Sequence, residues 1–150
     1  MIPYFKQKTV YTCGPASMRM VLASLGIRKT EKSIAKLLRV HPQKGLKNNR
    51  FPQFAEESGL KYIMKSPAKI DDIKELLKKK YGVIVNIQIF GWGRMIGHFA
   101  VVEKIRGEYI FIHDPNLGPS KKYLIKDFIK IWRGDPRGDN KKHWLIGIKK

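Results

Sequence analysis

The chain contains a single cysteine, Cys13, among its 150 residues. One cysteine excludes an internal disulfide framework, a zinc ribbon and a paired redox motif. It leaves one thiol whose role must be decided from its neighbours, because a lone cysteine is commonly a buried packing residue. No pair among the four histidines has the spacing of helical or finger-type ligands, so neither a metal site nor a cofactor is expected.

Acidic residues are also scarce, with 12 Asp and Glu against 31 Lys and Arg, which gives a net charge of +19. The excess runs along the whole chain. Such a field attracts nucleic acid, anionic lipid or acidic peptides, and it also keeps a protein in solution without any partner. No recognised nucleic-acid motif is present and the lysines are dispersed, so nucleic-acid binding is only an alternative. An acidic peptide or an anionic surface is expected as a secondary partner.

Apolar runs of membrane-spanning length are missing as well. No stretch approaches the ~20 apolar residues that a membrane-spanning helix needs. The N-terminus has no charged start followed by an apolar run, as a secretory signal would have. The sequence therefore predicts a soluble, cytoplasmic protein.

The order of sequence patterns predicts an α+β fold. A chain of this length, with 43% hydrophobic residues, fits one domain over residues 1–150. Helical spacing or capping signals mark residues 14–25, 30–38, 51–58, 71–80 and 126–132, whereas strand patterns mark residues 60–64, 83–90, 98–105, 108–113 and 143–148. Helices first and antiparallel strands later indicate two lobes, with a site expected in the cleft between them.

Cys13 stands at the start of the first predicted helix, directly before Gly14 and Pro15. Proline is favoured in the first turn of a helix because its missing N–H costs nothing there. The sulfur then lies at the positive end of the helix dipole, where the thiolate is favoured and the thiol pKa falls. This position favours a reactive cysteine over a packing one.

A thiolate nucleophile needs a base that is itself held in orientation. If the turn after residue 105 is centred on Arg106, residues whose numbers sum to 212 are paired, and His98 faces Asp114 across the hairpin. A two-residue turn would shift the pairing by one residue, yet both groups would stay at the same end. An imidazole and a carboxylate so placed form the orienting half of a catalytic triad. His113 is a rival base, but alternation points it to the opposite face of its strand.

Further residues are expected to complete such a site. Acyl transfer requires donors for the oxyanion; the Cys13 N–H is one, and the side-chain amide of Gln7 could fold back as another. Residues 91–97, GWGRMIG, are predicted to form a glycine-punctuated loop. Because this loop leads into a strand and not into a helix, it does not suit phosphate binding. We expect it to form a wall of the substrate cleft, with Trp92 and Gly97 contacting the substrate or, in the case of Trp92, acting as a hydrophobic anchor.

Three motifs resemble one known family. Residues 3–7 (PYFKQ) followed five residues later by 13–18 (CGPASM), then 97–102 (GHFAVV) and 114–115 (DP), are similar to the bacteriocin-processing, double-glycine cysteine peptidases, and to their stand-alone branch most of all. The resemblance implies a papain-like fold, a triad of Cys13, His98 and Asp114, and Gln7 in the oxyanion hole. Transporter-linked members carry an acidic residue where this chain has Thr12, and they are fused to membrane and ATP-binding domains that are lacking here. The catalytic machinery therefore carries over, and the substrate does not.

The sequence thus predicts a cysteine peptidase that hydrolyses a peptide or protein substrate through Cys13, His98, Asp114 and Gln7. Two alternatives use the same observations. The thiol site could transfer the acyl group to an amine in place of water, or the fold could be a non-catalytic basic module that binds nucleic acid.

Overall fold

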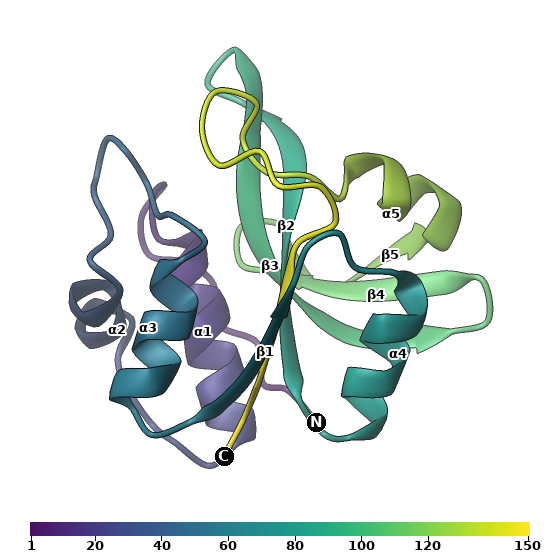
Figure 1. Cartoon of the computed structure of the whole chain (residues 1–150). Coiled ribbons are helices and arrows are strands. Elements are labelled where there is room, and N and C mark those ends of the chain that lie inside the picture. Colours follow the sequence, from purple (N-terminus) through teal and green to yellow (C-terminus); the bar gives the residue numbers. More distant parts are fainter.

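The computed structural model describes residues 1–150 and has an α+β architecture, as the sequence predicts (Figure 1). The strands form one antiparallel sheet in the order β1-β6-β2-β3-β4-β5. The helices are α1 (Cys13–Ser24), α2 (Glu31–Leu38), α3 (Arg50–Glu57), α4 (Ile70–Lys78) and α5 (Ile125–Ile131); the strands are β1 (Lys61–Lys65), β2 (Gly82–Gly91), β3 (Arg94–Arg106), β4 (Tyr109–Asp114), β5 (Gly118–Leu124) and β6 (Leu145–Lys149). None of the helices is long and apolar enough to cross a membrane.

The sheet has a hydrophobic core on each face. Helices α1, α2 and α3 gather on one side of it, whereas α4 and α5 lie on the other (Figure 1). Alternation along β2 supplies both cores, because Ile84 packs with the first set of helices and Val83 and Val85 pack with the second. The expected packing of N-terminal helices on an antiparallel sheet is therefore confirmed.

Local signals set several element boundaries. Helix α1 begins at Cys13, one residue before the predicted start. Thr30 caps α2, as expected, because its hydroxyl accepts a hydrogen bond from the Ser33 N–H at 3.1 Å. Asp72 in the first turn of α4 accepts a hydrogen bond from the Lys69 N–H at 2.7 Å, which satisfies an amide that the helix leaves free.

The predicted loop over residues 91–97 is wrong. Strands β2 and β3 form a long hairpin that closes at Trp92 and Gly93, which have positive φ angles of 54° and 74°. Positive φ at both central residues is the geometry of the tight hairpin turn that matches strand twist. Gly97 is part of the ladder and pairs with Gln88. A glycine is needed at this position because the backbone of another segment lies close to it: a Cβ on Gly97 would be 2.8 Å from the Asp135 nitrogen.

The segment after Asp114 and the β3–β4 turn also differ from the sequence patterns. No strand pattern marks residues 118–124, yet β5 continues the sheet there; Pro119 is tolerated because β5 is an edge strand. The β3–β4 turn is the two-residue type, since Arg106 pairs with Tyr109. With a register shift before Lys104, the regular pairing ends at Val101 and His113, so His98 does not face Asp114 directly.

Candidate active site

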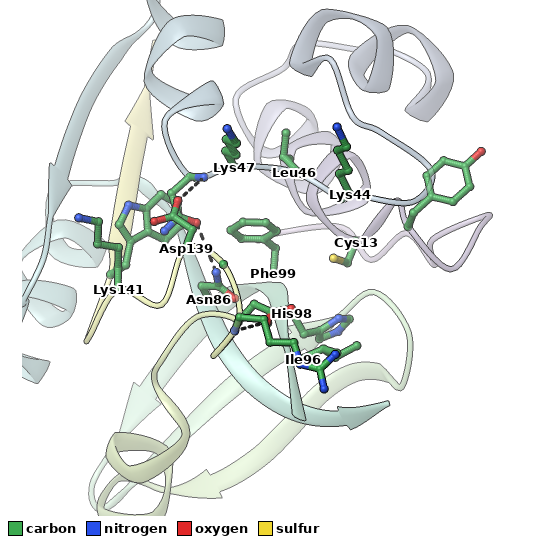
Figure 2. A pocket seen from close by; sticks show the side chains of 18 of the residues that line it. Cys13, Lys44, Leu46, Lys47, Asn86, Ile96, His98, Phe99, Asp139 and Lys141 are labelled. Atoms are coloured by element: carbon green, nitrogen blue, oxygen red, sulfur yellow. Dashed lines mark hydrogen bonds between the residues drawn. The ribbon is translucent and has the colours of Figure 1, made fainter. Parts of the chain in front are cut away.

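Cys13 and His98 meet where the N-terminus of α1 approaches β3 (Figure 2). The Cys13 residue is half-buried, and its thiol lies beside the His98 imidazole. Burial by itself raises the pKa of the Cys13 thiol. The hydrogen bond and positive charge of His98, together with the backbone N–H groups of Phe99 and Gly14, outweigh burial and hold that pKa below its ordinary value. The surroundings of the sulfur therefore favour its thiolate form.

The other side of the His98 ring contacts Asp114 at the end of β4. His98 Nε2 lies 2.8 Å from Asp114 Oδ1, and both side chains are almost fully buried. Since Nε2 is occupied by the carboxylate, Nδ1 is the nitrogen left for the thiol. Burial disfavours the imidazolium, but the hydrogen bonds and charges of Asp114 and Cys13 overcome it and raise the pKa of His98 to about 10.

Backbone amides hold the Asp114 carboxylate in its charged form. Its Oδ1 also accepts hydrogen bonds from the N–H groups of Asn116 at 2.8 Å and Leu117 at 3.0 Å. Burial raises the pKa of this carboxyl, whereas His98 and the two amides lower it, and the net result is a pKa below the ordinary value. The turn after β4 thus fixes both the position and the charge of Asp114.

The segment before α1 is tied to the same end of β4. The Tyr4 hydroxyl donates to the Asp114 carbonyl oxygen at 2.7 Å, and the Gln7 N–H donates to the Pro115 carbonyl at 2.8 Å. His113, the rival base, is buried and bonds through Nε2 to the Ile2 carbonyl at 2.9 Å. It therefore serves this attachment and takes no part in the Cys13 cluster.

Gln7 lies beside the site, in contact with its own turn. Its side-chain Nε2 donates to the Thr9 carbonyl at 2.8 Å, and its Oε1 is buried without a hydrogen-bond partner. The next residue, Lys8, donates its backbone N–H to both carboxylate oxygens of Glu31, at 3.0 and 3.2 Å. Glu31 was not predicted to support this segment, because an acid in the first turn of a helix is already explained by its interaction with the helix dipole.

Cys13 and His98 open onto a groove of about 1110 Å³. Both expected substrate contacts, Trp92 and Gly97, line it, and the Trp92 side chain at the hairpin tip is 64% exposed. Two loops provide much of the remaining lining, residues 42–49 and residues 135–141 (Figure 2). The second loop was not predicted to belong to the site.

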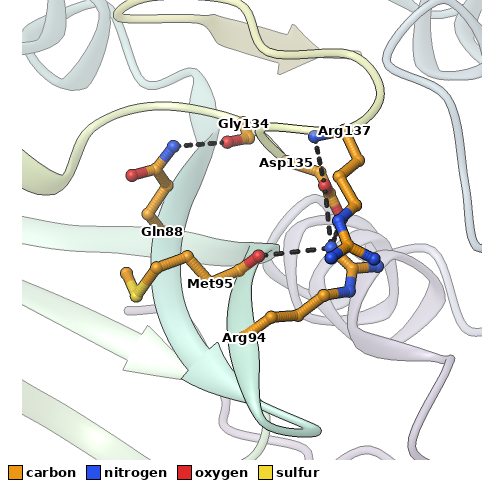
Figure 3. Close-up of polar contacts among 6 residues, drawn as sticks. All are labelled: Gln88, Arg94, Met95, Gly134, Asp135 and Arg137. Atoms are coloured by element: carbon orange, nitrogen blue, oxygen red, sulfur yellow. Dashed lines mark hydrogen bonds and ion pairs between the residues drawn. The ribbon is translucent and has the colours of Figure 1, made fainter.

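Polar contacts attach this second loop to the β2–β3 hairpin (Figure 3). Arg94 forms an ion pair with Asp135 at 3.1 Å, and Gln88 Nε2 donates to the Gly134 carbonyl at 2.9 Å. Toward the other loop, Asp139 accepts a hydrogen bond from the Asn48 N–H at 3.0 Å. The groove is thus built from segments that are far apart in the sequence.

No group of three or more His, Cys, Asp and Glu side chains comes together in a way that could hold a metal ion. His41 accepts hydrogen bonds within its own turn, and His143 stacks on Trp132 with ring centroids 4.8 Å apart. What the cluster does offer is a thiol of lowered pKa, an imidazole of raised pKa and a buried carboxylate at the edge of a groove. These are the components of nucleophilic catalysis on a carbonyl group.

Known proteins share this architecture. The peptidase domain of Streptococcus ComA, a bi-functional ABC transporter of a quorum-sensing pathway, superimposes with a TM-score of 0.75 at 18% identity, covering 99% of this chain and 98% of that one. A double glycine motif protease from an AMS/PCAT transporter, solved with its leader peptide, gives 0.70 at 21% identity, covering 99% and 91%. A putative C39-like peptidase from Bacillus anthracis gives 0.76 at 14% identity, covering 99% and 94%. The papain-like fold inferred from the motifs is confirmed.

Sequence comparison gives the family. The chain is 26% identical over 136 residues to the probable functional amyloid protease FapD of Pseudomonas aeruginosa, covering 86% of this chain. The chain spans 56% of the length of that curated relative. The model of the Peptidase C39 family matches residues 1–135. The chain therefore belongs to the peptidase C39 family.

Proposed function

We propose that this chain hydrolyses a peptide bond with Cys13 as nucleophile, His98 as acid and base, and Asp114 as the group that orients the ring. The observation that carries the proposal is that Cys13 and His98 line the same groove while the His98 ring lies 2.8 Å from the buried Asp114 carboxylate. The pKa shifts of Cys13 and His98 are in the directions that favour a thiolate–imidazolium pair.

In the first half of the reaction, the thiolate attacks the scissile carbonyl carbon and the carbonyl oxygen becomes an oxyanion. His98 gives its Nδ1 proton to the leaving amine, and the C–N bond breaks to leave a thioester. In the second half, neutral His98 takes a proton from water, the hydroxide attacks the thioester, and the acid product leaves as the thiolate–imidazolium pair is restored.

The oxyanion is assigned to the Cys13 N–H and the side chain of Gln7. The first amides of a helix have no intrahelical acceptor, so the Cys13 N–H suits a developing negative charge. The Gln7 amide must leave the Thr9 carbonyl to join it. Gln7→Glu should then reduce kcat/KM by about 10²–10³ through loss of a donor, with little change in thiol alkylation.

The experiment uses the single cysteine, because any alkylation of the native protein reports on Cys13 alone. The rate constant for iodoacetamide is measured against pH in the wild type and in His98→Ala. A fast reaction well below the thiol pKa of ~8.5, lost in His98→Ala, supports the activated pair. An ordinary thiol titration in both proteins would contradict it.

Turnover is tested separately with a peptide library and Cys13→Ala as the inactive control. Cleavage that depends on Cys13 is expected, with water as the acyl acceptor. Added amine should compete for the thioester, and a product made only with amine would favour acyl transfer over hydrolysis.

A further inference from the structure

Cationic side chains border the groove on several sides. Six of them line it: Lys44, Lys47, Lys65, Arg94, Arg137 and Lys141. Only two carboxylates, Asp135 and Asp139, do so. The question is which of these charges remains available to a bound peptide.

The two carboxylates already have partners. Asp135 forms the ion pair with Arg94 and also accepts a hydrogen bond from the Arg137 N–H at 2.8 Å (Figure 3). Asp139 accepts the Asn48 N–H. Among the cations, Lys65 pairs with Asp72 outside the groove, at 3.0 Å. Both carboxylates of the groove are therefore engaged by other groups of the protein, whereas most of its cations are not.

Four groove cations have no carboxylate partner: Lys44, Lys47, Lys141 and the guanidinium of Arg137. Lys44 and Lys47 extend from the loop that borders the groove on the side of α1, and Lys141 lies beyond Asp139 (Figure 2). Unpaired cations therefore lie on both loops that border the groove.

The reacting groups themselves do not cancel this field. A thiolate and an imidazolium form a neutral pair, and the charge of Asp114 is buried and satisfied by three donors. The groove also offers apolar surface, from Leu46, Phe99 and Trp144 among others. Concave walls concentrate the field of surface charges on whatever enters between them.

We propose that the groove selects peptides with Asp or Glu close to the scissile bond, next to apolar residues. This inference rests on the proposed peptidase function and adds the substrate class to it. A peptide fits the observations better than a lipid surface, because the cations and the thiol line a concave groove of about 1110 Å³ that a flat bilayer cannot enter.

The test compares two double variants that each lower the net charge from +19 to +17. Lys44→Gln/Lys47→Gln removes two groove cations, whereas Lys126→Gln/Lys130→Gln removes two exposed cations of α5 that do not line the groove. Quenched-fluorescent peptide mixtures share one randomised core and differ only in acidic, neutral or basic flanks. The readout is the ratio of kcat/KM for acidic over neutral flanks.

The wild type and the α5 variant should both prefer acidic flanks, and the preference should weaken as NaCl rises from 50 to 500 mM. In the groove variant, the ratio of kcat/KM for acidic over neutral flanks should fall by about 2- to 25-fold. Each exposed ion pair changes an equilibrium by up to about five-fold, and the variant removes two cations. Equal ratios in all three proteins, or equal losses in both double variants, would overturn the inference and leave the peptidase function intact.

Binding provides a second readout that needs no turnover. In a Cys13→Ala background, fluorescence anisotropy follows the acidic and the basic peptide, with an RNA oligonucleotide as competitor. Acidic peptide bound through Lys44 and Lys47 supports the inference even if no library member is cleaved, an outcome that would count against the peptidase function alone. RNA that displaces the peptide and binds the two double variants equally would overturn the inference in favour of unspecific charge attraction.

Discussion

Replacing Asp114 by asparagine separates the charge of this side chain from its shape. One oxygen, Oδ1, accepts all three hydrogen bonds, from the His98 ring and from the Asn116 and Leu117 amides. The other oxygen, Oδ2, is buried without a partner. An asparagine can therefore keep Oδ1 and its three donors in place and put its NH₂ where Oδ2 was, so the substitution removes mainly the negative charge.

The expected effect is a lower pKa of His98. A hydrogen bond to a charged group contributes about 1.5–3 kcal/mol, and one pKa unit corresponds to about 1.4 kcal/mol. Loss of the carboxylate charge should thus lower the His98 pKa from about 10 by about 1–2 units. Asp114 is not among the groups that shift the Cys13 pKa. The thiolate–imidazolium pair exists between the pH at which Cys13 loses its proton and the pH at which His98 loses its own. Asp114→Asn should lower only the second of these limits.

The assay is an NMR titration of the imidazole ring, with the His98 signal assigned by its absence in His98→Ala. Asp127→Asn, which removes an exposed carboxylate from α5, is the matched control. An unchanged His98 midpoint in Asp114→Asn would refute the reasoning, because the thiolate alone would then hold the proton. The raised pKa of His98 stabilises the folded state fully below pH 6.5, and this contribution is lost as the pH rises through about 10. The free energy of unfolding should therefore decrease over the same pH range.

Other substitutions test the supports of the site. Tyr4→Phe removes the bond to the Asp114 carbonyl and should lower the free energy of unfolding by about 1 kcal/mol, measured by urea denaturation. Gly97→Ala places a methyl group against the Asp135 nitrogen and should cost about 1–3 kcal/mol while reducing peptide cleavage; an unaffected protein would contradict the tight packing. Asp72→Ala removes an amide partner in α4 and should cost about 1 kcal/mol. Hydrogen bonds from the Lys69 N–H and the Lys65 side chain lower the pKa of Asp72 in the folded protein. The loss of stability in Asp72→Ala should therefore be present above pH 3.8 and disappear as the pH falls through the pKa of Asp72 in the folded state.

The sequence was informative where local signals place a residue. Cys13 follows from the start of a helix, and His98 and Asp114 follow from the open end of a hairpin. Their contact survives an incorrect register, because moving two antiparallel strands by a residue or two leaves the same ends together. The register shift next to Lys104 could not be predicted, since nothing in the strand pattern indicates where an extra residue is accommodated.

The walls of the groove depend on contacts between distant segments, and here the sequence was misleading. Three glycines between residues 91 and 97 indicated a loop, yet Gly97 belongs to a strand and its missing side chain makes room for the 135–141 loop. The ion pair of Arg94 with Asp135 joins residues 41 positions apart. Neither partner carries a local pattern that distinguishes it from the many other charged residues.

The segment that carries Gln7 combines an anchored backbone with a side chain that makes only a local hydrogen bond. Its backbone is held on both sides, by the Gln7 N–H on the Pro115 carbonyl and by the Lys8 N–H on the buried Glu31 carboxylate. Its side chain, in contrast, makes one hydrogen bond, to a carbonyl two residues away. In the proposed mechanism, rotation of the Gln7 amide toward the oxyanion would exchange one hydrogen bond for another without moving the backbone. Since the first anchor adjoins Asp114 and the second comes from α2, the position of Gln7 depends on both the sheet and the helical layer.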